Sequence, residues 1–157
     1  MDAIDSGILR LLQKNARLSL SEISLKVNLS VPAVSERIKK IESSGLVEQY
    51  TAILNPGMMK KDLTAMMFVS LDRPQFSSKF LAFVELQDEV LECHYIAGDF
   101  DYLLKIMTEN TSSLEKLLTK IKSVPGIQKT KTTVVLCTVK SKHSIVPDDN
   151  NLNEKRS

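Results

Sequence analysis

The chain changes its hydrophobic periodicity at Asn55-Pro56-Gly57, and this change limits the possible folds more than any other feature of the sequence. Before this point, apolar residues recur at the three- and four-residue intervals of amphipathic helices. After it, apolar and alternating runs typical of strands return repeatedly. Proline followed by glycine interrupts regular structure, and 157 residues suffice for two small domains. We therefore place a domain boundary here.

Three amphipathic helices are predicted before this boundary, at about residues 2–14, 21–27 and 31–44. Asn28 tolerates the left-handed backbone conformation and is expected to end the second helix. The turn between the second and third helices is three or four residues long, which is the spacing of a helix-turn-helix. A strand predicted at residues 46–54 follows, so this part of the chain is interpreted as a winged helix-turn-helix.

The third predicted helix has a face suited to the major groove of DNA. Its core stripe is Val34, Ile38 and Ile41, which leaves short side chains exposed near its beginning and cations near its end. Short side chains let a helix approach base edges, hydroxyl and carboxylate groups can hydrogen-bond to bases, and lysines can contact phosphates. The candidate DNA-contacting residues are Ser30, Pro32, Ala33, Ser35, Glu36, Arg37, Lys39 and Lys40.

Two alternatives stay open for this region. Arg37 lies beside the core stripe and can serve either DNA or a contact with another helix. The region can also be a plain three-helix bundle with a solvated charged face, because the net charge of residues 1–54 is only 7 − 6 = +1. Bulk charge therefore does not support DNA binding, and the prediction depends on helix spacing and on the local cluster of Arg37, Lys39 and Lys40.

The elements after the boundary follow the order β-α-β-β-α-β. Strands are predicted at 63–71, 90–97, 102–107 and 128–139, and helices at about 76–84 and 114–121, the second capped by Thr111 or Ser112. This order is that of a ferredoxin-like fold, in which both helices cover one face of a four-stranded antiparallel sheet. The fold class is therefore α+β. Because the strands are apolar on both faces, a partner subunit is the natural cover for the other face, and we expect at least a homodimer.

These patterns divide the chain into four parts. They are a DNA-binding domain with its trailing strand at 1–54, a linker at 55–62, the ferredoxin-like domain at 63–140, and a polar tail at 141–157, which we expect to be disordered from Pro147 onward. No apolar run reaches the length of a membrane span, and the first residues lack the pattern of a secretory signal. We expect a cytoplasmic protein without a membrane partner.

The turn Gly98-Asp99-Phe100-Asp101 between two predicted strands is a candidate ligand site. Gly98 opens the backbone so that N–H groups can bind a carboxylate, and Asp99 or Asp101 can pair with an ammonium group, a combination that fits a free amino acid. The alternative is a hairpin loop in which the aspartates only favour the turn. His94, just before the loop, is either a half-buried strand residue or a neighbour of the ligand.

No enzyme motif accompanies these candidate sites. The sequence lacks a phosphate-binding glycine loop, a nucleophile elbow, an HExxH pair and a CxxC pair. Its two cysteines, Cys93 and Cys137, are expected to be reduced thiols on strands. We therefore expect neither an enzyme nor a cofactor or metal site.

Several runs of the sequence resemble the Lrp/AsnC, or feast/famine, family of transcription regulators over about residues 2–140. In the first part they are Ile4-Asp5 with Ile8-Leu9, Ala16-Arg17-Leu18-Ser19, Glu22-Ile23, Leu29-Ser30 with Val34 and Arg37, Gly45, and Tyr50-Thr51-Ala52. In the second they are Leu54-Asn55-Pro56, Glu92-Cys93-His94, Gly98-Asp99-Phe100-Asp101-Tyr102-Leu103-Leu104-Lys105, Pro125-Gly126-Ile127 and Thr130-Lys131-Thr132. The combination of these runs is highly specific for this family.

The resemblance implies a sequence-specific regulator that binds double-stranded DNA through its first domain and senses a small amino acid through its second, with the strand at 46–54 as a hinge between them. It also implies dimerisation through the sheet and assembly of dimers into larger rings, often octamers. The family's effector sits between dimers, which implies an effector site at Gly98, Asp99, Phe100, Asp101, Thr130 and Thr132. His94 is added as a candidate neighbour of the effector because it lies just before the loop. The controlled genes would serve amino-acid metabolism or transport.

Two alternatives to such a regulator remain open. One is an architectural protein that compacts DNA with little sequence preference, and the other is an amino-acid-binding regulator of enzymes that does not bind DNA. A regulator should keep a large ratio of specific to non-specific DNA affinity at physiological salt, whereas an architectural protein should not. Val31-Pro32-Ala33 and the polar tail differ from the best-known members, so operator sequence and effector do not carry over.

Overall fold

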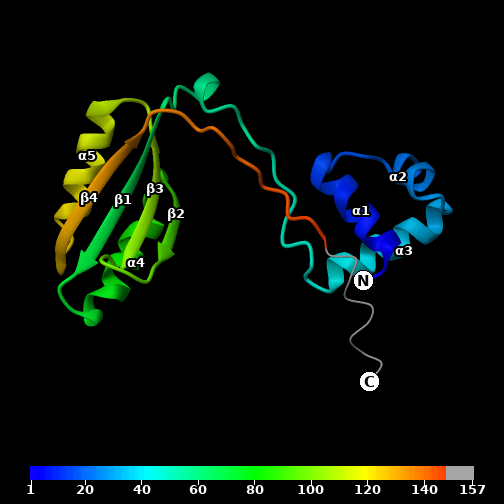
Figure 1. The fold of residues 1–157 in the computed structure, drawn as a ribbon, viewed down its shortest axis with the longest axis horizontal. Coiled ribbons are helices and arrows are strands. Elements are labelled where there is room, and N and C mark those ends of the chain that lie inside the picture. Colours follow the sequence, from blue (N-terminus) through cyan, green and yellow to red (C-terminus); the bar gives the residue numbers. More distant parts are fainter. Residues whose placement is uncertain (148–157) are drawn as a thin grey trace. The chain divides into compact units, whose positions relative to one another are not determined.

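In the computed structural model, which describes residues 1–147, the chain forms two compact units (Figure 1). The first unit contains Met1–Ala52 together with the described residues from Lys140 onward, and the second contains Ile53–Val139. The chain therefore passes between the units twice, once after Ala52 and once after Val139. Residues 148–157, which belong to the predicted polar tail, lie outside the described residues.

Three helices form most of the first unit. They are α1 (Ala3–Lys14), α2 (Leu20–Val27) and α3 (Val31–Ser43). Asp2 and Ser19 begin α1 and α2 with capping boxes, in which the cap and the third helical residue each accept a hydrogen bond from the other's backbone N–H. Asn28 ends α2 in the left-handed conformation, with φ of 53°, and Ser30 caps α3. The three predicted helices and both of these boundaries are confirmed.

A small apolar core holds the three helices together. Its buried members are Ile8, Leu9, Leu12, Ile23, Val34 and Ile41. Burying one large aliphatic side chain stabilises a fold by roughly 1.5–3 kcal/mol, so this cluster is the main attachment between helices whose surfaces are otherwise polar. Because α3 contributes Val34 and Ile41 from one face, its opposite face is left to solvent.

The strand predicted at residues 46–54 does not form, because this segment has no regular secondary structure. Its alternation of apolar residues is present in the sequence, but a strand also needs a partner for its backbone N–H and C=O groups. Within residues 1–147, no segment pairs with it. Leu46, Ile53 and Leu54 consequently stay exposed. The prediction of a hinge strand is wrong for the single chain.

The second unit is a four-stranded sheet with both α-helices on one face (Figure 1). Its elements are η1 (Gly57–Met59), β1 (Leu63–Leu71), η2 (Pro74–Phe76), α4 (Ser77–Glu85), β2 (Val90–Tyr95), β3 (Tyr102–Thr108), α5 (Thr111–Lys122) and β4 (Ile127–Val135). The strand order is β2-β3-β1-β4, and neighbouring strands are antiparallel. The predicted order of elements and the ferredoxin-like fold are confirmed.

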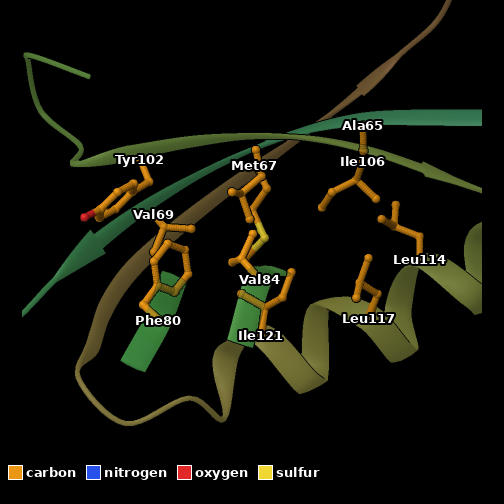
Figure 2. Packing of buried hydrophobic residues seen from close by; sticks show 11 residues of the cluster. Ala65, Met67, Val69, Phe80, Val84, Tyr102, Ile106, Leu114, Leu117 and Ile121 are labelled. Carbon is orange, nitrogen blue, oxygen red and sulfur yellow. The ribbon is translucent and has the colours of Figure 1, made fainter. Parts of the chain in front are cut away.

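The core of this unit lies between the sheet and the two helices (Figure 2). Alternate residues of β1 and β3, such as Met67 and Ile106, are fully buried there against Phe80 of α4 and Ile121 of α5. The intervening residues lie on the other side of the sheet, which we call the open face. From β1 and β3 the open face includes Met66, Phe68, Leu103, Lys105 and Met107, all of them half-buried.

The last strand is shorter than its alternation predicts. β4 ends at Val135 instead of residue 139, because its partner β1 begins at Leu63 and the last pair of the ladder joins Val135 to Thr64. Beyond this pair, β4 has no neighbour to continue with. The same pair brings the beginning of β1 and the end of β4 side by side.

The cap of α5 also differs from the prediction. Asn110, and not Thr111 or Ser112, precedes the helix, and its side-chain oxygen accepts a hydrogen bond from the Ser113 N–H at 3.0 Å. The Ser113 hydroxyl accepts one in return from the Asn110 N–H, also at 3.0 Å. Asparagine and serine cap helices about equally well, so residue type alone did not distinguish the candidates.

Candidate functional sites

The exposed face of α3 contains most of the residues predicted to contact DNA. Exposed members are Pro32, Glu36, Lys39 and Lys40, and half-buried members are Ala33 and Ser35. Ser30 lies at the N-cap, where its hydroxyl accepts a hydrogen bond from the Ala33 N–H at 3.4 Å. Because the opposite side of α3 packs in the core, this face presents small side chains along its first turn and cations farther along.

Arg37 differs from these residues because its guanidinium is bound to α1. Its Nη1 lies 2.7 Å from Oδ2 of Asp2 and 2.6 Å from Oδ1 of Asp5. These hydrogen bonds raise the pKa of Arg37 above its ordinary value. The pKa of Asp2 is lowered, mainly by the hydrogen bond from the Asp5 backbone N–H and further by Arg37. Arg37 thus links α3 to the first turn of α1 in the single chain.

The loop between β2 and β3 is closed by backbone hydrogen bonds. The Ile96 N–H donates to the Asp101 carbonyl at 2.8 Å, and the Asp101 N–H donates to the Val69 carbonyl of β1 at 2.9 Å. Gly98 has φ of 140°, a conformation that favours glycine. The backbone N–H groups of residues 97–100 have no hydrogen-bond partner in the described part of the chain. Such a loop can bind an anion through its N–H groups.

The two aspartates of this loop have different surroundings. Oδ2 of Asp101 accepts a hydrogen bond from the Leu71 N–H at 2.7 Å, where the pairing of β1 with β4 shifts register between Ser70 and Leu71. The Ser70 hydroxyl donates to the Asp99 carbonyl at 3.3 Å, whereas the Asp99 side chain is exposed. Asp101 therefore anchors the loop to β1, and Asp99 faces solvent.

Phe100 joins the loop to the open face and to β4. Its ring centroid lies 5.4 Å from that of Phe68. Nζ of Lys129, near the beginning of β4, lies 5.1 Å from the Phe100 ring centroid, within the range of a cation–π interaction. The loop thus lies at the end of the sheet where β4 begins.

His94 belongs to a charged cluster on β2 and β3. Its Nε2 lies 3.1 Å from Oε2 of Glu92, and Nζ of Lys105 donates to Oε1 of Glu92 at 2.7 Å. Lys105 and then His94 lower the pKa of Glu92. The His94 side chain is 55% exposed, so it is accessible to a ligand or to another subunit.

The predicted effector residues do not all meet within one chain. β2 and β4 are opposite edges of the sheet, separated by β3 and β1, which places them about 14 Å apart at roughly 4.8 Å per strand spacing. Thr130 and Thr132 are half-buried on β4, where they pair with Val69 and Met67 of β1. One amino acid cannot contact these threonines and His94 of the same chain. The loop lies at the end of the sheet where β4 begins, but the threonines share the core-facing side with Val69 and Met67, whereas Phe100 packs against Phe68 of the open face.

Several residues that shape these sites were not predicted as parts of them. They are Asp2, Asp5, Phe68, Leu71, Glu92, Lys105 and Lys129. The partners of Arg37 lie 32 and 35 residues away, and no local pattern reveals which helix faces which. Alternation does assign Phe68 and Lys129 to strands, but their shared surroundings follow only from the strand register.

Residues 1–147 contain neither a metal-binding cluster nor a membrane-spanning helix. Among them, no group of three or more His, Cys, Asp or Glu side chains could hold a metal ion. Cys93 and Cys137 are free thiols, and burial raises the pKa of Cys93. Cys137 lies beyond the end of β4, so the prediction that both cysteines lie on strands is wrong for this one. No helix within residues 1–147 is long and apolar enough to cross a membrane.

The sequence matches two known protein-domain families and several known proteins. Residues 1–48 match winged helix-turn-helix DNA-binding domains, and residues 64–145 match the Lrp/AsnC ligand binding domain. The leucine-responsive regulatory proteins of Salmonella typhimurium and Escherichia coli K12 are each 38% identical to the chain over 149 residues. Each match covers 93% of this chain and 91% of the relative.

Solved structures share the fold along nearly the whole chain. A transcriptional regulator from Neisseria meningitidis, solved in complex with L-methionine, has a TM-score of 0.89 and 33% identity and covers 92% of this chain and 96% of its own. Escherichia coli AsnC has a TM-score of 0.87 and 27% identity and covers 94% of this chain and 99% of its own. Both units and the segments that join them therefore have counterparts in known regulators.

The first unit corresponds to the matched helix-turn-helix domain, and the second to the matched ligand binding domain. The helix-turn-helix unit exposes one face of α3, and the βαββαβ unit contains the loop whose N–H groups are unpaired in the described chain. The matched family consists of transcription regulators and not of enzymes, as the sequence predicted. The chain belongs to the Lrp/AsnC family: it is a DNA-binding transcription regulator with a winged helix-turn-helix unit and the family's ligand-binding domain.

Proposed function

We propose that the exposed face of α3 contacts base edges in the major groove of a specific operator. The observation that carries this proposal is the joint exposure of Glu36, Lys39 and Lys40, while Arg37 is bound to α1. The small residues of the first turn would allow a close approach to the bases. Ser35 and Glu36 would hydrogen-bond to bases, and the two lysines would contact phosphates. Arg37 would position the helix.

Competition binding with single-residue variants tests this assignment, using an operator selected from random duplexes and unrelated duplexes. Ser35→Ala and Glu36→Ala should change the preferred base at one position, by about 1–3 kcal/mol of discrimination. Lys39→Ala and Lys40→Ala should weaken binding to all duplexes alike and lower the slope of log affinity against log salt by about one each. Lys122→Ala, which removes an exposed charge from α5, is the matched control and should change neither property.

Two outcomes would contradict the proposed interface. Equal losses across all duplexes for the Ser35, Glu36, Lys39 and Lys40 variants would mean that this face does not contact bases. A wild-type protein whose affinity for the selected operator equals its affinity for random DNA at physiological salt would be an architectural, DNA-compacting protein instead.

We also propose that the effector is a free α-amino acid bound at the loop of residues 97–101. The unpaired N–H groups of residues 97–100 would hold its carboxylate, and the Asp99 side chain and the second oxygen of Asp101 would hold its ammonium group. The Neisseria meningitidis regulator binds L-methionine, which supports the chemical class but not the same side chain. A thermal-shift screen against the twenty amino acids tests this proposal, since a protein that none of them stabilises would not be an amino-acid sensor.

The remaining predicted effector residues would reach the site from two directions. Thr130 and Thr132 would line it from β4 of the same chain. His94 would come from a neighbouring copy, because β2 and β4 are opposite edges of the sheet. An effector bound between copies would favour one assembly state and thereby change the spacing of the α3 helices along DNA.

The proposed oligomer begins with two open faces packed against each other. Met66, Phe68, Leu103 and Met107 would form its apolar centre, and dimers would associate further into an octamer. In light scattering at micromolar concentration, Met66→Lys should shift the protein toward monomer because it buries a charge in this centre. Leu81→Lys places the same charge on α4, where the leucine is 42% exposed, and should leave the dimer intact. A dimeric Met66→Lys protein would contradict this interface.

The proposed binding partners, DNA and a free amino acid, indicate the cellular compartment in which the protein acts. We infer that the protein acts in the cytoplasm, where it can reach both DNA and free amino acids, and that its target genes serve amino-acid metabolism or transport. Transcript profiling with and without the gene, at high and low amino-acid supply, checks this: unchanged transcripts of such genes would contradict the inferred targets.

A further inference from the structure

A short segment near the end of the described chain lies against α1 of the first unit. Nε2 of Gln13 donates a hydrogen bond to the carbonyl of Ile145 at 2.8 Å, and the Ile145 N–H donates one to Oε1 of Gln13 at 2.7 Å. A side-chain amide that binds both backbone groups of one residue reproduces one residue pair of a β ladder. Gln13 therefore binds an extended backbone and gives it a defined direction.

A second contact extends this pairing along α1. Nη2 of Arg10 donates to the carbonyl of Pro147 at 3.4 Å. Arg10 and Gln13 are three residues apart, and residues at this spacing are neighbours on a helix surface. Arg10, Gln13 and Lys14 line a shallow site with residues 144–147. Two side chains of one helix face thus bind carbonyls two residues apart.

The hydrogen bonds from Arg10 and Gln13 reach the backbone of the segment. Ile145 and Val146 are 81% and 80% exposed, so apolar burial contributes little to this docking. Pro147 has no N–H group and a fixed φ, and its carbonyl accepts the hydrogen bond from Arg10. Recognition therefore requires an extended backbone with a free N–H at residue 145.

We propose that Arg10 and Gln13 form a docking site on α1 for the chain's own segment 144–147. The winged helix-turn-helix unit is then a discontinuous structure that contains both ends of the described chain. It is joined to the ligand-binding domain by two chain passages, after Ala52 and after Val139. A second passage restricts how far the DNA-binding unit can turn on its linker.

Disulfide trapping distinguishes docking within a chain from docking between copies. Cysteines are introduced as Lys14→Cys and Ile145→Cys in the full chain, with Cys93→Ser and Cys137→Ser to remove the native thiols. Both positions line the docking site, and the substitutions leave the Gln13 side chain and the Ile145 backbone in place. Under oxidising conditions the double variant should form a bond that leaves the chain at monomer size on a non-reducing denaturing gel. Each single-cysteine variant is a control for unrelated bonds. A cross-linked dimer, or no bond in the double variant, would overturn the proposal.

Amide hydrogen exchange of the full-length protein tests the same docking without cysteines. In the wild type the Ile145 amide should exchange about tenfold more slowly than in an unstructured peptide, as expected for a closed but exposed hydrogen-bond pair. Gln13→Ala should remove this protection. Gln13→Glu keeps an acceptor for the Ile145 N–H but cannot donate to its carbonyl, and should retain part of it.

The matched control for hydrogen exchange is Gln49→Ala. Gln49 is exposed, and it makes no side-chain hydrogen bond to any residue in the range 1–147, so its loss should leave the Ile145 amide protected. An Ile145 amide that is unprotected in the wild type, or equally protected in Gln13→Ala, would mean that the segment is not docked on α1.

Discussion

Nη1 of Arg37 lies 2.6 Å from Oδ1 of Asp5, so the helix proposed to contact DNA is tied to the first turn of α1 by a charged hydrogen bond. A second bond from the same atom reaches Asp2. Arg37 therefore affects the position of α3 without facing outward with Lys39 and Lys40. Its loss and the loss of a DNA-contacting lysine should have different consequences.

We expect Arg37→Ala to lower both stability and DNA affinity. Losing hydrogen bonds to partly exposed carboxylates should cost about 1–2 kcal/mol of unfolding free energy, and a less well-placed α3 should bind all duplexes more weakly. Lys39→Ala should weaken DNA binding while leaving thermal unfolding unchanged. Arg37→Ala with wild-type stability but altered operator preference would instead identify Arg37 as a base-contacting residue.

Acidification should destabilise the helix-turn-helix unit through its caps. The pKa of Asp2 is lowered by the Asp5 N–H and by Arg37, and that of Glu22 is lowered by the Ser19 N–H and hydroxyl. A carboxyl whose pKa is lower in the folded state contributes stability above its unfolded pKa of about 4 and loses it as the pH falls through the folded pKa. The melting temperature, followed by circular dichroism, should therefore fall below about pH 4.

Asp2→Asn isolates the contribution of one cap to this pH dependence. Asparagine still caps a helix but does not titrate, so the variant should be less stable near neutral pH and should lose less of its remaining stability on acidification. Glu36→Gln removes an exposed carboxylate from α3 and is the matched control. If the melting temperatures of Asp2→Asn and the wild type fall in parallel as the pH is lowered, Asp2 does not contribute to the pH dependence of stability.

Asp101 should have two separable roles, because one of its oxygens binds the Leu71 N–H. Asp101→Asn keeps an acceptor for this N–H but loses the charge proposed to hold an ammonium group. It should fold normally and bind the effector at least tenfold more weakly in calorimetry, the usual size of a lost charge-assisted bond. Asp101→Ala should lose stability as well. Wild-type effector affinity in Asp101→Asn would place the ammonium group elsewhere.

Gly126 should tolerate substitution less well than Gly98, although both have positive φ, 91° and 140° respectively. A Cβ atom at Gly126 would overlap the ring of Phe76, whereas one at Gly98 would meet no atom within 4 Å. We expect Gly126→Ala to cost about 3 kcal/mol of unfolding free energy, from backbone strain and overpacking together. Gly98→Ala should cost about 1 kcal/mol. Equal losses in chemical denaturation would show that Phe76 moves aside.

The elements that the sequence predicted well are those whose pattern is local. Helical periodicity and capping residues located α1, α2 and α3, and apolar runs located β1 and β3 to within a residue. The strand predicted at residues 46–54 did not form, because strand formation depends on a partner that is not local in the sequence. Alternation describes a strand's faces, but a partner for its backbone must come from elsewhere, and within the described chain none does.

The candidate sites were predicted at the level of segments rather than of contacts. The exposed face of α3 followed from periodicity alone, whereas the bonds of Arg37 to Asp2 and Asp5 depend on how α1 and α3 cross. The loop at Gly98 was found through its residue types. The anchoring of Asp101 to Leu71 depends on an irregularity of β1 that leaves no trace in the alternation.

The pairing of Thr64 with Val135 has a consequence for the order in which the protein is completed during synthesis. Helices α1 to α3 leave the ribosome first and can fold at once. Gln13, however, must wait for Ile145, which is 132 residues away in the sequence. While the intervening chain is unfolded, closing so long a loop is entropically unfavourable. Once the sheet has formed, β1 and β4 lie side by side, so the loop that remains to be closed contains far fewer flexible residues than the original one. We therefore expect the sheet to form before residues 144–147 dock on α1.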